Sequence, residues 1–255
     1  MTTAEKHFAD GLRSHREQRL QDAVAHYTEA IRLNPNHADA YNNRALVYSE
    51  MGDYDRAYKD WEEALRIRPD FVEVYNNIGI SYYMQNETPR SLFYYDQALE
   101  KNPDFVEAYI NRGLAYKELE QLERAIVDLD RAIARAPQNT MARYLRGAAF
   151  AMLEQWERAY EDWAETLRLD PNYNQVYFQR GTARLNQRKF DEAVADLTEA
   201  IRHDPQNADA YVNRMIALIL IGKRDEALQD KQTALALGVD EDFIDEELSK
   251  SLGRL

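Results

Sequence analysis

The sequence predicts an all-α protein built from seven copies of one helix-turn-helix unit. The chain of 255 residues has only 9 glycines and 7 prolines, and so few turn residues favour helix. Six of the prolines recur every 34 residues, and a fixed period of this length is typical of stacked units that bury each other's apolar faces. Between the prolines, apolar residues are spaced by three and four, which is the helical period. The six prolines are Pro35, Pro69, Pro103, Pro137, Pro171 and Pro205.

Placing each proline at position 32 of its unit defines the repeats. The predicted bounds are 4–37, 38–71, 72–105, 106–139, 140–173, 174–207 and 208–241, followed by a tail over 242–255. Internal alignment then gives each position a role. Small residues recur at position 8 of the first helix and at positions 20 and 27 of the second helix, where two backbones must approach closely. Large residues recur at positions 4 and 24, where they fill the space between.

The ends of the two predicted helices have recognisable signals. Gly52 and Gly222 fall near position 15, where we place the turn between the helices. Proline at position 32 ends the second helix, because it lacks an N–H and disfavours helical geometry in the residue before it. Each repeat is therefore expected to form one antiparallel helix pair.

This pattern resembles the tetratricopeptide repeat, whose 34-residue unit has an aromatic residue at position 4, Gly at 8, Tyr at 11, Ala at 20 and 27 and Pro at 32. The resemblance covers nearly the whole chain. It implies a right-handed α-solenoid of seven units with a capping helix at the C-terminus. An apolar stripe in the tail fits such a cap: Phe243, Ile244, Leu248, Leu252 and Leu255. The alternative is that the tail folds into the groove of the solenoid as an internal ligand.

An ion pair is predicted inside five of the repeats. Position 7 is Arg in the same five repeats that have Asp at position 23, and the other two repeats lack both residues. If the turn lies near position 15, positions 7 and 23 face each other across the helix pair, and a two-bond Arg–Asp bridge is expected. The expected pairs are Arg44–Asp60, Arg112–Asp128, Arg146–Asp162, Arg180–Asp196 and Arg214–Asp230.

Composition excludes several classes of function. The net charge of −13 argues against binding to nucleic acid or to an anionic membrane surface. With no cysteine, the chain can have no disulfide framework and no thiolate metal site, which favours a cytoplasmic protein. No apolar run is long enough to cross a membrane. We find no nucleophile with a base, no phosphate loop and no metal-ligand spacing. The sequence therefore predicts a protein that is not an enzyme and has no cofactor or metal.

The resemblance implies that the first helices line a concave groove. Position 6, on the groove side, carries amides in five repeats: Asn43, Asn77, Asn111, Gln179 and Asn213. An amide can pair with a backbone N–H and C=O together, so this row is expected to hold an extended peptide. It resembles the asparagine ladder in the repeat domain of O-linked N-acetylglucosamine transferase. The alternative is that these are ordinary polar surface residues.

Position 2 places Asp39, Glu73 and Glu107 beside the amides. An acidic groove of this kind should attract basic or neutral segments and repel acidic tails. Family members that bind the acidic C-terminal tails of chaperones need lysine and arginine at several groove positions. Of that set only the asparagine at position 6 is present, so chaperone tails are not the expected partner.

The groove of the later repeats is expected to be apolar. Groove residues there include Met141, Tyr144, Leu145, Met152, Phe178, Val212 and Ile216, which we predict to accept an apolar anchor or an amphipathic helix. Two alternatives are occupation of this part by the tail helix and burial in a homodimer.

The leading prediction is a scaffold or adaptor that binds a partner polypeptide in its groove. Two alternatives come from other classes of function. The chain could be a self-associating structural scaffold, or a regulatory subunit of an enzyme whose catalytic domain lies on another chain. The identity of the partner is not encoded in a repeat pattern, because a fold supplies a surface and not an address.

Overall fold

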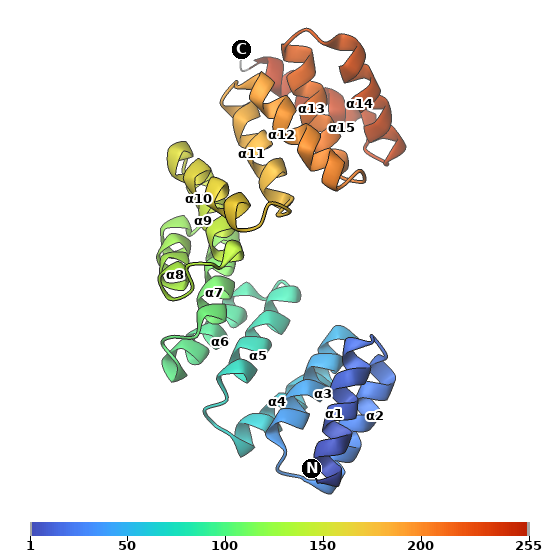
Figure 1. The fold of residues 1–255 in the computed structure, drawn as a ribbon, viewed down its shortest axis with the longest axis vertical. Coiled ribbons are helices and arrows are strands. Elements are labelled where there is room, and N and C mark those ends of the chain that lie inside the picture. The colour runs from blue at the N-terminus through green and yellow to red at the C-terminus, as the bar shows by residue number, and fades with distance from the viewer. Residues whose placement is uncertain (1, 254–255) are drawn as a thin grey trace. The chain divides into compact units, whose positions relative to one another are not determined.

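The computed structural model describes residues 2–253, with side chains described for residues 2–251, and this range is helical without strands (Figure 1). The chain divides into two compact units, of which unit 1 ends at Ala136 and unit 2 begins at Pro137. The helices of unit 1 are α1 (Thr3–Arg16), α2 (Leu20–Leu33), α3 (Ala38–Glu50), α4 (Tyr54–Ile67), α5 (Val72–Met84), α6 (Thr88–Lys101), α7 (Val106–Glu118) and α8 (Leu122–Arg135). Those of unit 2 are α9 (Thr140–Met152), α10 (Trp156–Leu169), α11 (Gln175–Asn186), α12 (Phe190–His203), α13 (Ala208–Leu220), α14 (Arg224–Ala236) and α15 (Glu241–Gly253).

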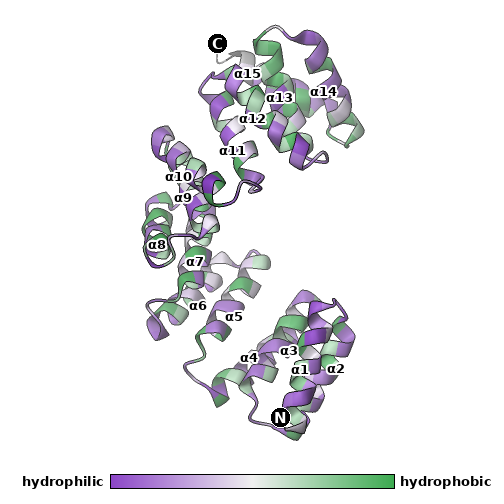
Figure 2. Ribbon diagram, viewed as in Figure 1, coloured by the Kyte–Doolittle hydropathy of each residue, from purple (hydrophilic) through white to green (hydrophobic). Residues whose placement is uncertain are grey.

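Within each unit, consecutive helices pack as pairs, and neighbouring pairs pack side by side. In unit 1, for example, α3 pairs with α4, and it also contacts α1 and α5, which are the first helices of the adjacent pairs. Figure 2 shows hydrophobic and hydrophilic residues alternating along most of the helices, whereas α13 is hydrophobic over much of its length. Amphipathic helices of this kind bury one face against their neighbours.

The turn inside each pair lies at position 15, as the sequence predicts. In the fourth turn of unit 1, the Gln121 N–H donates to the Tyr116 carbonyl at 2.9 Å, and Glu120 between them has φ 55°. This left-handed residue closes the helix end and allows the chain to reverse. The equivalent residues all have positive φ: Gln18, Gly52, Asn86, Glu120, Glu154, Arg188 and Gly222. Only two of the seven are glycine.

Replacing Glu120 by glycine should raise the free energy of unfolding by about 0.5–1 kcal/mol, because a side chain in the left-handed region is strained and glycine is not. Gly52→Ala is the matched control. Gly52 has φ 77°, so an added Cβ there should lower the free energy of unfolding by about 1 kcal/mol. Urea unfolding measures both. Shifts of the same sign in the two variants would contradict this account of the turn.

The prolines end the second helices as predicted. The residue before each proline leaves the helical region; Asn102, for example, has φ −138° and ψ 97° immediately before Pro103. The interior of each pair also follows the repeat pattern. Residues at positions 20 and 27 are buried, and so are the large residues at position 24, such as Trp61 and Trp163, which are both 0% exposed. The small residues therefore allow the helices to close around a large side chain.

All five predicted Arg–Asp bridges are present, each with two hydrogen bonds. In the second pair, Arg44 Nε and Nη2 each donate to Asp60 at 2.7 Å. The other four bridges have distances of 2.6–2.8 Å: Arg112–Asp128, Arg146–Asp162, Arg180–Asp196 and Arg214–Asp230. Burial acts to lower the pKa of Arg44, but its bonds to Asp60 and the charge of Asp60 outweigh that effect, so the pKa lies above the ordinary value.

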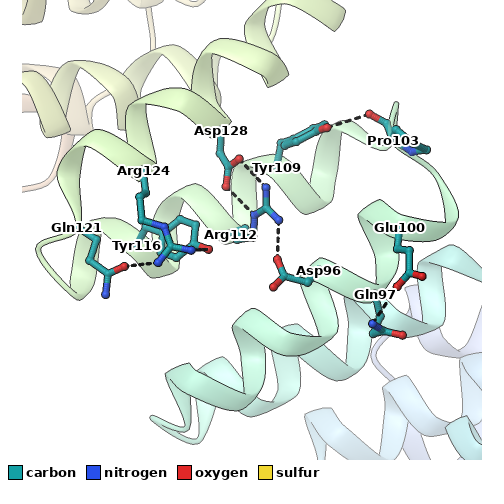
Figure 3. A network of polar contacts seen from close by, with 10 residues as sticks. All are labelled: Asp96, Gln97, Glu100, Pro103, Tyr109, Arg112, Tyr116, Gln121, Arg124 and Asp128. Carbon is teal, nitrogen blue, oxygen red and sulfur yellow. Dashed lines mark hydrogen bonds and ion pairs between the residues drawn. The ribbon is translucent and has the colours of Figure 1, made fainter.

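The bridges also tie neighbouring pairs together. Arg112 Nη1 reaches Asp96 on α6, at 2.5 Å, so its guanidinium lies between two carboxylates (Figure 3). In the same way Arg44 donates to Thr28 at 2.9 Å, and Arg214 donates to Thr198 at 3.1 Å. The third partner is at position 25 of the preceding repeat in each case. This contact was not predicted, because position 25 varies among Thr, Glu, Asp, Ala and Gln and gives no single-residue signal.

The C-terminal helix α15 packs against α13 and α14. Ile244 is fully buried among residues that include Met215, Ala227 and Ala234, and Leu248 packs partly against the same cluster. Lys231 of α14 binds Glu241 and Asp245 on α15 at 2.9 and 3.0 Å. Phe243, by contrast, is 45% exposed. The predicted stripe also includes Leu252 and Leu255, which lie outside the residues whose side chains are described.

Candidate functional site

The amides predicted to hold a peptide lie at equivalent places on the first helices. Asn43, Asn77 and Asn111 lie on α3, α5 and α7 of unit 1, and we call these three residues the amide row. All three side chains are half-buried. Because each first helix contacts the next within the unit, the three amides are neighbours across successive helices. Gln179 and Asn213 occupy the same repeat position in unit 2, on α11 and α13.

Each member of the amide row donates one hydrogen bond into the protein. Asn77 Nδ2 donates to Asn42 Oδ1 at 3.0 Å, and Asn111 Nδ2 donates to Asn76 Oδ1 at 2.9 Å. Asn43 Nδ2 donates instead to the carbonyl of Asp39 at 2.8 Å. Their Oδ1 atoms receive no hydrogen bond from the described residues. A ligand can therefore use the oxygen and one remaining N–H of each amide in the row. The other N–H of each amide is already bonded within the protein.

Asn42 and Asn76 are part of this site, and sequence reasoning missed them. They are only 7% and 6% exposed, and each receives an N–H from the next repeat. Asn42 also accepts from the indole N–H of Trp61 at 3.2 Å. The available signal was the Asn-Asn dipeptide repeated 34 residues apart, at 42–43 and 76–77. A buried asparagine with bonded partners fixes the orientation of the amide that it contacts.

Two of the three predicted carboxylates are free to meet a ligand. Glu73 and Glu107 are exposed, and no described residue pairs with them. Each precedes an amide of the row by four residues, so carboxylate and amide lie one turn apart on the same helix face. Asp39 differs, because Arg68 Nη2 binds its carboxylate at 2.6 Å. The unpaired negative charge of this face thus comes from α5 and α7.

Two further carboxylates of the predicted groove are engaged by neighbouring repeats. Glu50 lies 2.9 Å from the His15 Nε2, and Glu118 accepts the hydroxyl of Tyr83. Burial and the charge of Glu118 raise the pKa of Tyr83, which keeps its proton and its role as donor. These contacts link successive first helices, as the amide bonds also do.

The predicted apolar surface of unit 2 is smaller than expected. Leu145 was expected to line it, but Leu145 is buried, with 5% exposed, because a leucine is stabilised by packing inside the unit. Val212 and Ile216, which were expected to extend the surface, are likewise buried, at 3% and 2%. Met141 and Met152 are each 49% exposed.

Two aromatic residues of that surface are half-buried. The rings of Tyr144 and Tyr173 are 5.2 Å apart, and burial raises the pKa of Tyr144 against the effect of its hydrogen bond with Gln179. In unit 2, Asn213 Nδ2 donates to Thr182 at 3.0 Å, as the amides of unit 1 donate to their neighbours. Phe178 is half-buried as well. Tyr144, Met152 and Phe178 are the predicted residues that keep some exposed surface.

Two other kinds of site are absent from the described part of the chain. It contains no cluster of three or more His, Cys, Asp or Glu side chains that could hold a metal ion. None of its helices combines the length and the apolar character that a membrane crossing requires.

Comparison with known families decides the classification. Models described as tetratricopeptide repeat match residues 38–71, 72–105, 106–139 and 178–238, and a model described as TPR repeat matches residues 11–52. The chain belongs to the tetratricopeptide repeat family. Three of these matches have the same bounds as the second, third and fourth predicted repeats.

Curated tetratricopeptide relatives match only short segments. Hsp70-Hsp90 organizing protein 3 of Arabidopsis thaliana is 43% identical over 61 residues, which is 24% of this chain and 11% of that protein. Translocon at the outer membrane of chloroplasts 64 of Pisum sativum is 42% identical over 50 residues, 20% of this chain and 8% of that protein. The chain thus spans about a tenth of the length of these relatives.

Solved tetratricopeptide structures match over much more of the chain. A repeat protein from Parabacteroides merdae has a TM-score of 0.72 at 20% identity and covers 98% of both chains. PilF of Pseudomonas aeruginosa has a TM-score of 0.73 at 19% identity, covering 84% of this chain and 97% of its own. YrrB, described as a TPR protein with an unusual peptide-binding site, has a TM-score of 0.58 at 25% identity and covers 76% and 98%. The all-α helical-repeat solenoid predicted from the sequence is confirmed.

Proposed function

We propose that this protein is a non-enzymatic adaptor that binds a basic, extended polypeptide segment along the first helices of unit 1. The observation that carries the proposal is the pairing of a free carboxylate with an amide oxygen, one turn apart, on both α5 and α7. Each pair consists of acceptors that no described residue satisfies. A lysine or arginine side chain supplies the donors and the positive charge that such a pair lacks.

The spacing of the pairs suggests the spacing of the partner's cations. Packed helices lie about 8–10 Å apart, and three residues of extended chain span about 10 Å. A segment with a basic residue at every third position therefore fits one cation to each pair. The remaining N–H of each amide can bind a partner carbonyl, so part of the predicted backbone recognition is retained.

Acidic chaperone tails are not the partner that we propose, although five of the matched relatives are named Hsp70-Hsp90 organizing proteins. The corresponding face of unit 1 has Phe8, Asn42, Asn76 and Ile110 at position 5, where family members that bind such tails need lysine. An acidic tail would instead meet Glu73 and Glu107. The absence of cysteine favours the cytoplasm as the place of binding.

Replacing both Glu73 and Glu107 by glutamine should weaken binding of a basic peptide by at least about tenfold at low salt. The probe is an acetylated peptide of about twelve residues, with lysine at every third position and threonine and glycine between. Isothermal titration calorimetry measures its affinity. The peptide with glutamine in place of lysine should bind more weakly to the natural protein, and the peptide with glutamate should not bind detectably.

The control removes the same amount of charge elsewhere. Glu62→Gln with Glu123→Gln changes two exposed carboxylates on the second helices α4 and α8, and it should leave the affinity unchanged. Asn77→Ala with Asn111→Ala should weaken both the lysine and the glutamine peptides, because it removes the shared amide contacts. Equal binding of all three peptides to the natural protein would reject the proposal.

Unit 2 supports a second part of the proposal, an apolar contact through Tyr144, Met152 and Phe178. The half-exposed Met152 is the observation that favours it, because methionine side chains adapt to differently shaped partners. The same surface would serve a homodimer. Light scattering over a range of protein concentrations distinguishes an external partner from a homodimer. A monomer at every concentration supports an external partner.

A further inference from the structure

The helices α13, α14 and α15 of unit 2 line an open pocket of about 270 Å³. Its lining is mainly apolar and includes Met215, Ile219, Leu228, Ile244 and Leu248. We call it the α13–α15 pocket. Because it is formed by the last pair and the C-terminal helix, it shares no residue with the amide row or with the surface around Met152.

The pocket follows from a departure in the repeat pattern. In every earlier repeat, position 24 holds a large apolar side chain that is at most 1% exposed: Tyr27, Trp61, Tyr95, Leu129, Trp163 and Leu197. The seventh repeat has Lys231 there, and its ammonium turns outward to Glu241 and Asp245 at 2.9 and 3.0 Å. Met215 replaces the usual glycine at position 8 and fills only part of the space. An open, mainly apolar pocket remains where the earlier repeats bury a large side chain.

Three charged side chains line the pocket, Arg224, Lys231 and Asp245, and of these three only Arg224 lacks a partner of opposite charge among the described side chains. Lys231 is already bound by two carboxylates, whereas Arg224 lines the pocket, is exposed and has no carboxylate partner among the described side chains. Arg224 is also the first residue of α14, where Asp225 and Glu226 in the same turn already offset the positive end of the helix dipole. A carboxylate from outside would therefore pair with the Arg224 guanidinium itself.

The size of the pocket selects the kind of occupant. Sites for drug-sized ligands and cofactors have volumes of about 300–1,000 Å³, so 270 Å³ suits one large side chain better. Leu228 is 56% exposed and extends the apolar surface beyond the pocket. Buried apolar anchors of this kind dominate the affinity of many protein interfaces. We propose that the α13–α15 pocket docks a partner polypeptide through one large apolar side chain that lies next to a carboxylate, with Arg224 binding that carboxylate.

Methyl NMR on the full chain tests the proposal, because Met215, Ile219 and Ile244 place reporter methyl groups in the lining. The probe is the capped peptide acetyl-Gly-Phe-Glu-Gly-amide. It should shift these methyl resonances in a saturable manner. The peptides with Gln for Glu and with Ala for Phe should each bind at least about tenfold more weakly.

Two variants locate the contact. Arg224→Gln should abolish the preference for the Glu peptide over the Gln peptide. Leu228→Glu should block both, because it places a carboxylate beside Arg224 and removes apolar surface. Leu235→Glu, on the same helix but outside the lining, is the matched control and should change neither affinity.

Three results would overturn the proposal. The pocket methyl groups could fail to shift with the Phe-Glu peptide, or they could shift equally with all three peptides. They could instead shift with protein concentration alone while light scattering reports a dimer, which would make a second copy the occupant. None of these results bears on the amide row, so failure here is distinguishable from failure of the proposed function.

Discussion

Replacing Asp60 by alanine should lower the free energy of unfolding by about 3–5 kcal/mol, because it leaves the Arg44 guanidinium largely buried with no carboxylate. The side chains of Arg44 and Asp60 are 15% and 9% exposed, and two hydrogen bonds of 2.7 Å join them. After the substitution Arg44 keeps only the hydroxyl of Thr28. A neutral oxygen cannot balance a positive charge that has lost most of its water.

Two companion variants show whether the loss comes from an unpaired charge. Asp128→Ala should cost less than Asp60→Ala, because Arg112 retains Asp96 at 2.5 Å. The double variant Arg44→Met with Asp60→Leu should also cost less, since it removes both charges and leaves apolar groups that can pack. If the double variant lost as much stability as Asp60→Ala, the loss would come from the packing of the two side chains and not from an unpaired charge.

Urea unfolding followed by circular dichroism measures these losses. Repeat proteins unfold with coupling mainly between neighbouring repeats, so a single transition is not assured. Hydrogen exchange of the backbone amides in α3 and α4 should therefore be measured together with urea unfolding. Those amides should lose protection in Asp60→Ala, whereas amides in α13 and α14 should change little.

Much of the fold was predictable because a repeat reports each position several times. The turn at position 15, the helix ends before the prolines and the Arg44–Asp60 type of bridge each recur at fixed spacing. A pairwise contact inside one repeat is readable when both partners appear and disappear together. The bridge met that condition, since the repeats that lack Arg at position 7 also lack Asp at position 23.

Contacts between repeats were harder to predict. Asparagine occupies position 5 in only two repeats, as Asn42 and Asn76, so the repeated Asn-Asn dipeptide was a weak signal for their bonds to Asn77 and Asn111. The exposure of a groove residue was also not determined by its position. Asn111 and Leu145 share position 6, but the asparagine is half-buried while the leucine is 5% exposed. Position assigns a residue to a helix face, and polarity then decides how deeply its side chain packs.

Replacing Gly79 by alanine should lower the free energy of unfolding by about 1–3 kcal/mol, although alanine is the better helix former. A Cβ at Gly79 would lie 2.5 Å from Cε1 and 2.7 Å from Cδ1 of Tyr95. The Tyr95 ring is rigid and 1% exposed, so it cannot move aside without disturbing the pair. Urea unfolding measures the loss.

Gly113→Ala provides the comparison, because Leu129 occupies the place of the tyrosine there. The nearest atom to a new Cβ is Leu129 Cγ at 2.9 Å, on a side chain that can change rotamer. We therefore expect a smaller loss, below about 1 kcal/mol, since the higher helix propensity of alanine offsets part of the strain.

A double-mutant cycle isolates the clash itself. Tyr95→Leu gives the third repeat the glycine–leucine combination that the fourth repeat has naturally, and it should cost stability by removing a buried ring. Adding Gly79→Ala to Tyr95→Leu should cost much less than Gly79→Ala alone, because the leucine can yield where the ring could not. Additive losses would mean that the cost of Gly79→Ala comes from the backbone of α5 and not from a clash with the ring of Tyr95. The expected coupling would instead show that positions 8 and 24 are fitted to each other repeat by repeat, as the pairing of Met215 with Lys231 in the last repeat also indicates.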